Sequence, residues 1–222
     1  MTNLPIVLAS TSPRRKELLG LFQVPFEVMP ADINEDVLQD EAPEAYVQRL
    51  ALEKAQTIAR ALAGRPAIVI AADTTVVHQG QIIGKPEDAA DAERILRSLR
   101  GQSHQVFSGL CLLNTATGEQ VVELAESQVP MRNFSDSEMS AYIASGEPMD
   151  KAGAYGIQNS SFHPVEDFAG CFANVAGLPL CHVLRNWRLW GLPLAVDDLP
   201  HACQRHLNYD CPVSQPILDW EL

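Results

Sequence analysis

The sequence predicts an α/β fold built on a mixed sheet. In the first hundred residues, short apolar runs alternate with stretches of helical periodicity, an order typical of strands joined by helices. From Ser103 to Asn133 the pattern becomes strand-like around a turn at Thr115–Gly118. The chain has 222 residues, 46% of them hydrophobic, so it can bury the core of one domain of generous size.

The elements of the first hundred residues are bounded by local signals. Ser12 is expected to cap a helix that has Pro13 at its first position. A later helix should stop at Gly101. In order, we expect a strand at Pro5–Ala9, the helix from Pro13, a helix from Pro43 to about Ala63, a buried strand at Ala67–Ala72 that ends at Asp73, a small hairpin at Val76–Ile83, and a helix at Asp88–Leu99.

The second half is less regular. Ser135 and Glu138 form a capping-box pattern, which predicts a short helix after them. The segment Met149–Phe172 is punctuated by glycine and is expected to be strand-like in parts, and the last helix should start at Pro179. After residue 192 the pattern breaks, so residues 193–222 are predicted to be an irregular acidic extension of a domain that spans residues 1–192.

Composition excludes several classes of protein. Lys and Arg total 16 and Asp and Glu total 28, which gives a net charge of −12 and disfavours binding to nucleic acid. The longest apolar run, Ala67–Ala72, is far too short to span a membrane. The first nine residues show no secretory signal, and five scattered cysteines fit reduced thiols, so we expect a cytoplasmic protein. His201, Cys203, His206 and Cys211 match no standard zinc spacing, which disfavours a metal site there.

Basic residues occur at two places that need an explanation. Arg14, Arg15 and Lys16 follow Ser12 in the first turn of a helix, where the helix dipole is already positive. Either a phosphate docks on this turn or the turn is simply solvated. Lys54 lies on the apolar stripe of its helix, so it either extends to solvent or points at an anion.

Three further segments carry polar groups suited to a phosphate or a base. Asp73 and Thr74 follow a buried strand, where a carboxylate can hold a divalent metal, take a proton from water, or only cap a turn. In Gly84-Lys85-Pro86, glycine allows close approach and lysine offers a charge. The glycine-rich segment Gly146–Gln158 ends in an amide that can read a base edge.

Taken together, these segments resemble the Maf family of nucleoside triphosphate pyrophosphatases. The resemblance covers about residues 4–192 and implies an elongated mixed sheet flanked by helices, with two lobes around a cleft, similar to the inosine triphosphate pyrophosphatases. It rests on five segments that occur in the family's order: S-T-S-P-R-R at Ser10–Arg15, A-D-T-T-V at Ala72–Val76, G-K-P at Gly84–Pro86, G-E-P-M-D-K-A-G-A-Y-G-I-Q at Gly146–Gln158 and N-V-A-G-L-P-L at Asn174–Leu180.

The resemblance also implies roles for single residues. The family's proton acceptor falls on Asp73, and Glu35 is its expected partner in holding a divalent metal, Mg²⁺ or Mn²⁺. Substrate-binding positions fall on Ser10, Arg14, Arg15, Lys54, Thr74, Lys85 and Gln158, of which Arg14, Thr74 and Gln158 are linked to base choice. Asn159 and the residues up to His163 depart from the family pattern.

The function expected from this resemblance is hydrolysis of nucleoside triphosphates, with dTTP and UTP preferred, to a monophosphate and pyrophosphate. The resemblance further implies a cytoplasmic enzyme that forms a homodimer. Two alternatives stay open: a pyrophosphatase for modified nucleotides such as 7-methyl-GTP, and a nucleotide-binding regulator of cell division that has no turnover.

Overall fold

The computed structural model describes residues 4–219 as helices packed on one mixed sheet. The strands follow the order β2-β1-β3-β5-β6, with β4 paired to one end of β3. The two parallel pairings are β1 with β2 and β1 with β3, whereas β3, β5, β6 and β4 pair antiparallel, as the sequence predicts for a mixed sheet. The strands are β1 (Ile6–Leu8), β2 (Phe26–Val28), β3 (Ile68–His78), β4 (Gln81–Ile83), β5 (Ser103–Asn114) and β6 (Gln120–Pro130).

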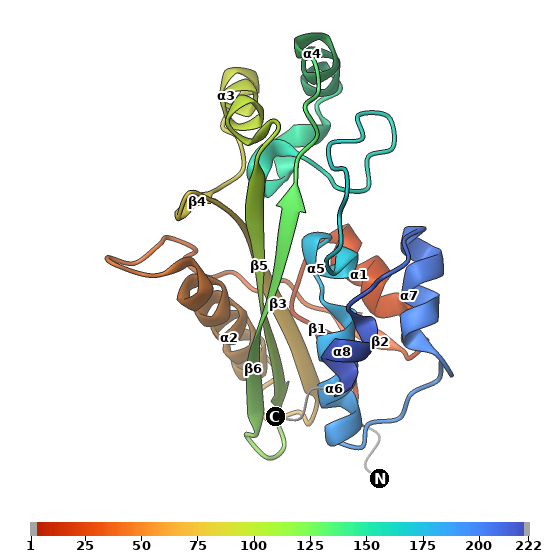
Figure 1. Cartoon of the computed structure of the whole chain (residues 1–222). Coiled ribbons are helices and arrows are strands. Elements are labelled where there is room, and N and C mark those ends of the chain that lie inside the picture. The colour runs from red at the N-terminus through yellow and green to blue at the C-terminus, as the bar shows by residue number, and fades with distance from the viewer. Residues whose placement is uncertain (1–3, 220–222) are drawn as a thin grey trace.

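The helices form two groups at the two ends of the long strands β3, β5 and β6 (Figure 1). One group packs beside the upper ends of these strands, and the other lies beside the short strands β1 and β2. The first group contains α3 (Ala89–Leu99), α4 (Asp136–Ala144) and the 3₁₀ turns η1 (Glu147–Asp150) and η2 (Ala152–Ala154); the second contains α1 (Pro13–Gly20), α5 (Phe172–Val175), α6 (Leu180–Leu189), α7 (Leu199–Leu207) and α8 (Ser214–Asp219), while α2 (Pro43–Ala61) covers the other face of the sheet.

The buried run in β3 supplies both faces of the sheet. Successive side chains of a strand point to opposite faces, so Val69 and Ala71 pack against the apolar stripe of α2. Ile68 and Ile70 pack on the opposite face, in a core that includes Trp187 of α6. This double burial explains why residues 67–72 are uniformly apolar.

Several local predictions are confirmed. The Ser12 hydroxyl accepts a hydrogen bond from the backbone N–H of Arg15 at 3.4 Å and caps α1. The capping box of Ser135 and Glu138 starts α4, with both reciprocal bonds present. The hairpin between β3 and β4 turns at Gln79 and Gly80, whose φ angles of 51° and 76° suit a tight turn.

The strand that we expect to end at Asp73 instead continues to His78. Aspartate is unfavourable in strands, but here its backbone pairs with Gly109 of β5, and the following Thr-Thr-Val-Val residues favour extended structure. The edge strand β2 has only three residues and was not predicted from the sequence.

Two further expectations are wrong. Before α5 begins at Phe172, residues 149–171 contain no strand, only 3₁₀ turns, loops and one isolated bridge, and the positive φ angles of Gly153 and Ala154, 72° and 58°, interrupt any extended run there. The tail is not irregular, since α7 and α8 form in it. Asp198 caps α7, and Leu199 and Cys203 join the core around α1 and α6. Within residues 4–219, no helix is long and apolar enough to cross a membrane.

Candidate active site

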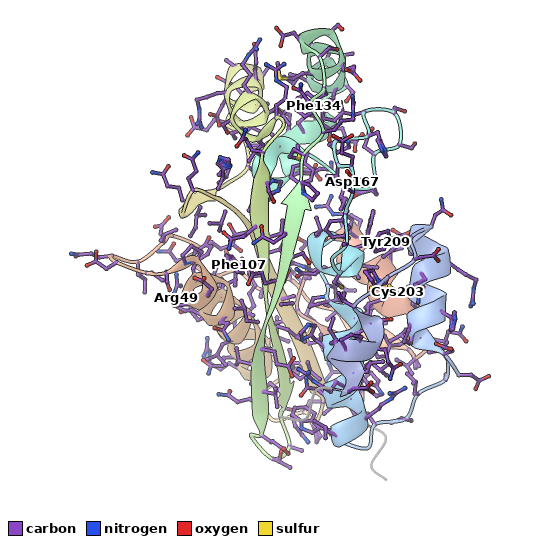
Figure 2. All side chains as sticks on the ribbon, viewed as in Figure 1. Arg49, Phe107, Phe134, Asp167, Cys203 and Tyr209 are labelled. Atoms are coloured by element: carbon purple, nitrogen blue, oxygen red, sulfur yellow. The ribbon has the colours of Figure 1, made fainter. Side chains whose placement is uncertain are left out.

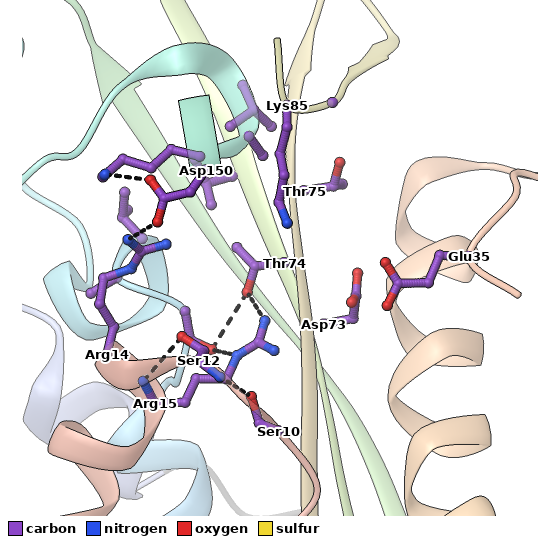
Figure 3. A pocket seen from close by; sticks show the side chains of 18 of the residues that line it. Ser10, Ser12, Arg14, Arg15, Glu35, Asp73, Thr74, Thr75, Lys85 and Asp150 are labelled. Carbon is purple, nitrogen blue, oxygen red and sulfur yellow. Dashed lines mark hydrogen bonds and ion pairs between the residues drawn. The ribbon is translucent and has the colours of Figure 1, made fainter. Parts of the chain in front are cut away.

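One cavity of about 660 Å³ opens where the two groups of helices meet, a volume typical of small-molecule sites. Its walls come from the start of α1, the middle of β3, the loop after β4, the glycine-rich segment and the turn after α5 (Figure 3). All nine residues singled out from the sequence line it: Ser10, Arg14, Arg15, Glu35, Lys54, Asp73, Thr74, Lys85 and Gln158.

The position of the cavity follows from the length of β1. β1 pairs with β3 only as far as Ile70, so beyond that point one side of β3 has no parallel neighbour. Because side chains alternate along β3, Asp73 faces α2 and Thr74 faces α1 and the turn after α5. Consecutive residues of one strand therefore reach the cavity from opposite faces of the sheet.

Arg15 is held by neutral oxygen atoms. Its Nε donates to the carbonyl oxygen of Gly177 at 2.8 Å, and its guanidinium donates to the hydroxyl of Thr74 at 3.3 Å. The Thr74 hydroxyl also lies 2.8 Å from that of Ser108 on β5. Burial lowers the pKa of Arg15, and the nearby carboxylate of Asp73 opposes this effect. Within residues 4–219, no direct ion pair neutralises the charge of Arg15.

Arg14 points along the opposite wall of the cavity. Its guanidinium lies 3.8 Å from a carboxylate oxygen of Asp150, and the other oxygen of Asp150 accepts a hydrogen bond from Lys151 at 2.6 Å (Figure 3). The same segment leads to Gln158, which is exposed on the cavity wall. The ion pairs therefore connect the start of α1 to the segment that carries Gln158.

Lys54 bridges the two carboxylates expected to hold a metal. Its ammonium lies 2.6 Å from Asp73 Oδ1 and 2.6 Å from Glu35 Oε1. The Lys54 side chain is 9% exposed, so it does not extend to solvent. It points at anions, as one of the two expectations had it, and these anions are the carboxylates of Asp73 and Glu35. Figure 3 shows the carboxylates of Asp73 and Glu35 facing each other across the cavity wall.

The electrostatics of this corner favour an ionised Glu35. Burial acts to raise the pKa of Glu35, but the hydrogen bond and charge of Lys54 hold it below its ordinary value. Burial and the charges of Asp73 and Glu35 raise the pKa of Tyr46 to about 12. The Tyr46 hydroxyl donates to the backbone carbonyl of Glu35 at 2.9 Å, which anchors the Glu35 loop to α2.

The donor set suits a hard divalent cation. Mg²⁺ and Mn²⁺ take oxygen ligands and are commonly held by one or two carboxylates together with substrate phosphates and water. Asp73 and Glu35 supply two such carboxylates. Nowhere in residues 4–219 do three His, Cys, Asp or Glu side chains form a group that could hold a metal on their own, and this includes the tail.

Sequence reasoning missed three residues that organise the site. Ser108 holds Thr74, Asp150 pairs with Arg14, and the carbonyl of Gly177 holds Arg15. A serine among the buried apolar residues of β5 was the available signal for Ser108. Gly177 has a φ of 112°, which suits glycine, and a Cβ there would lie 3.5 Å from Arg15 Nε.

A nucleotide-sized cavity in which cations face paired carboxylates defines an α/β protein suited to phosphate chemistry. The model of the Maf-like protein family matches residues 5–188, and the chain belongs to this family. It is 46% identical to a dTTP/UTP pyrophosphatase of Geobacter sp. (strain M21), over 86% of this chain and 98% of that protein. It is 44% identical to a dTTP/UTP pyrophosphatase of Geotalea uraniireducens (strain Rf4), over 84% and 95%. A solved dITP/XTP pyrophosphatase structure from Mycobacterium abscessus shares 16% identity at a TM-score of 0.40, over 85% of this chain and 97% of that one.

Proposed function

We propose that this protein hydrolyses nucleoside triphosphates to a nucleoside monophosphate and pyrophosphate, with dTTP and UTP as preferred substrates. The observation that carries the proposal is the convergence of all nine predicted residues on one cavity, in which Lys54 holds the pair Asp73 and Glu35 and the other cations line the walls. The names of the similar proteins, dTTP/UTP pyrophosphatases, support the same activity and the same bases.

The cations in the cavity suit a triphosphate. Arg15 offers a guanidinium that is held by neutral acceptors, and Lys85 is an exposed ammonium on the cavity wall (Figure 3). Ser10 adds a hydroxyl beside the first turn of α1, where its Oγ accepts from the backbone N–H of Ser12 at 3.1 Å. These groups bind and orient the phosphates, so that the bond between the α and β phosphates faces Asp73.

Asp73 is the proposed general base. It accepts the proton of the water that attacks the α phosphorus, and Lys54 holds the carboxylate in place through the 2.6 Å contact at Oδ1. Asp73 and Glu35 would hold the divalent cation, which when bound offsets the negative charge that develops on the leaving pyrophosphate.

The base preference is assigned to Gln158. Its amide is exposed on the cavity wall, and an amide can donate and accept at the O4/N3 edge of uracil or thymine. A cytoplasmic location and a homodimer complete the proposal; the five cysteines, all free thiols, fit a reducing compartment.

The test is release of pyrophosphate from dTTP, UTP, CTP, ATP, GTP and 7-methyl-GTP with Mg²⁺ or Mn²⁺. We expect dTTP and UTP to have the highest kcat/KM, and Asp73→Asn to lower kcat by about 10²–10⁴ while the fold is retained. Asp197→Asn, an exposed aspartate in the tail, is the matched control and should keep full activity. Nucleotide binding without pyrophosphate release would favour the regulator, and a lead for 7-methyl-GTP would overturn the assignment of the base.

A further inference from the structure

Four of the five cysteines gather around one small cavity lined by residues of α5, α6 and α7. Cys171, Cys181, Cys203 and Cys211 all line it, whereas Cys111 is buried in β5. Cys203 and Cys211 belong to the tail, beyond residue 188 where the family match ends. This grouping is therefore created by the part of the chain that the family model does not cover.

The tail is fixed against the segment that carries Cys171. The hydroxyl of Tyr209 is shared between the carbonyl oxygens of Gly170 at 3.0 Å and Phe168 at 3.1 Å. The Tyr209 ring also packs on Phe168 and Phe172, with centroids 5.5 and 5.4 Å apart. Figure 2 places Tyr209 beside α5 and Cys203 on α7. These contacts bind the chain just before Cys211 to the chain on both sides of Cys171.

The contacts of Tyr209 hold the chain that carries Cys211 near Cys171, and both cysteines line the same cavity. The interaction of the two thiols lowers the pKa of Cys211 to about 6 and raises that of Cys171. Cys211 is half-buried and Cys171 is 5% exposed, so a small oxidant reaches Cys211 first.

The other two cysteines of the cavity are poorer candidates. Burial raises the pKa values of Cys181 and Cys203 to about 12, and both side chains are buried. The charge of Cys211 adds to the effect of burial at both residues. The Tyr209 contacts beside Cys171 and Cys211, together with the burial of Cys181 and Cys203, therefore favour one pair out of the four thiols.

We propose that Cys171 and Cys211 are an oxidation site at which peroxide forms a disulfide that ties the C-terminal tail to α5. The Cys211 thiolate attacks one oxygen of hydrogen peroxide; the O–O bond breaks, the departing hydroxide becomes water, and Cys211 is left as a sulfenic acid. The sulfur of Cys171 then attacks the sulfur of Cys211, the S–O bond breaks, and the hydroxide leaves with the Cys171 proton as a second water. Two thiols are oxidised and one peroxide is reduced to two waters.

The disulfide should stabilise the fold. It closes a loop of roughly 40 residues that contains α6 and α7, and a cross-link of that length restricts the unfolded chain. The hydrogen bond from Tyr209 to Gly170 already holds the two segments together in the folded protein. We expect the Tm to rise by about 5–10 °C on oxidation and to return on reduction.

The test uses the full-length purified chain and no nucleotide, so its outcome is independent of the proposed function. The protein is treated with one equivalent of hydrogen peroxide, remaining thiols are alkylated under denaturing conditions, and the intact mass, linked peptides and Tm are measured with and without dithiothreitol. We expect a mass loss of about 2 Da, a peptide linking Cys171 to Cys211, and the reversible rise in Tm.

Variants decide which thiols are involved. Cys211→Ser, at a half-buried position, should lose the link and the Tm rise, and so should Cys171→Ser if that buried substitution folds. Cys181→Ser, Cys203→Ser and the matched control Cys111→Ser should keep both. Another pairing, a link between two chains, a stable sulfinic acid on Cys211, or no change in mass would each overturn the proposal.

Discussion

Gly109 marks the closest approach between helix α2 and the sheet, and we predict that Gly109→Ala damages both stability and activity. A Cβ at this position would lie 2.1 Å from the carbonyl oxygen of Val47 and 2.7 Å from the backbone nitrogen of Gln48. Ordinary contacts begin at 3.4 Å, and backbone atoms of a helix cannot move aside singly, so α2 must retreat by about 1 Å or more. Gly109 pairs with Asp73 across the strands, and α2 carries Lys54, so the shift reaches the site.

The magnitude follows from this overlap. Overpacking a core typically costs about 1–3 kcal/mol, and a clash with helix backbone belongs at the upper end. A loss of about 3 kcal/mol lowers the Tm of a chain of this length by roughly 6–12 °C. Because a displacement of about 1 Å at a catalytic group can cost about 100-fold, we expect kcat/KM for dTTP to fall at least about 10-fold.

The assay pairs thermal unfolding with pyrophosphate release. Gly20→Ala is the matched control, since Gly20 ends α1 and a Cβ there would meet nothing within 4 Å. Alanine is the better helix former, so this variant should be as stable as the wild type or more so, with normal kcat/KM. A Gly109→Ala protein within about 2 °C of the wild-type Tm and with full activity would refute the reasoning.

Three further predictions concern single side chains. Gln158→Ala should reduce the kcat/KM preference for dTTP and UTP over ATP and GTP by about 10-fold, with little effect on ATP, because an unpaired buried base edge costs roughly 1–3 kcal/mol. Gln102→Ala is the control. An unchanged preference in Gln158→Ala would exclude Gln158 as the residue that reads the base. Glu123 is 8% exposed, and although burial opposes the shift, hydrogen bonds from His182, Arg185 and Asn186 lower its pKa to about 2. The stability that this ionised carboxylate contributes is complete above its unfolded pKa of about 4.3 and is lost as the pH falls toward 2. In urea titrations from about pH 7 down to about pH 2, Glu123→Gln should be less stable than the wild type by about 2–3 kcal/mol at pH 7 and should lack this part of the pH dependence. A variant whose stability follows the same pH profile as the wild type would contradict this. Lys54→Met removes the cation that pairs with the carboxylates of Asp73 and Glu35. Mn²⁺ should therefore bind the nucleotide-free protein about 10-fold more tightly, while kcat falls. Unchanged or weaker Mn²⁺ binding would show that Asp73 and Glu35 are not metal ligands.

The fold could be predicted where local signals and burial agree. The caps at Ser12 and Ser135 use side chains that bond within three residues, so the sequence contains all of the information. The continuation of β3 through Asp73 depends instead on a partner strand 36 positions away, Gly109 on β5. Helix α7 has a readable cap at Asp198 and apolar residues at helical spacing, but the stretch is short and its stability comes from packing on the core.

The candidate site shows the same limit. Its cationic and acidic residues were recognisable because their types are unusual for their positions, as with Lys54 on an apolar helix face. Residues that hold these side chains in place were harder to recognise, because a serine in an apolar strand such as Ser108, or a loop aspartate such as Asp150, does not reveal its partner until the strands and turns are assembled. The sequence indicates which groups do chemistry more readily than which groups position them.

The partners of the cations also explain how a protein of charge −12 can attract a triphosphate. Lys54 is neutralised by two carboxylates and serves to position them, whereas the direct hydrogen bonds of Arg15 go to a carbonyl and a hydroxyl. Arg15 and the exposed Lys85 therefore give the cavity a local positive potential that the net charge does not reveal. One compact anion can enter a cavity of about 660 Å³ and meet these cations.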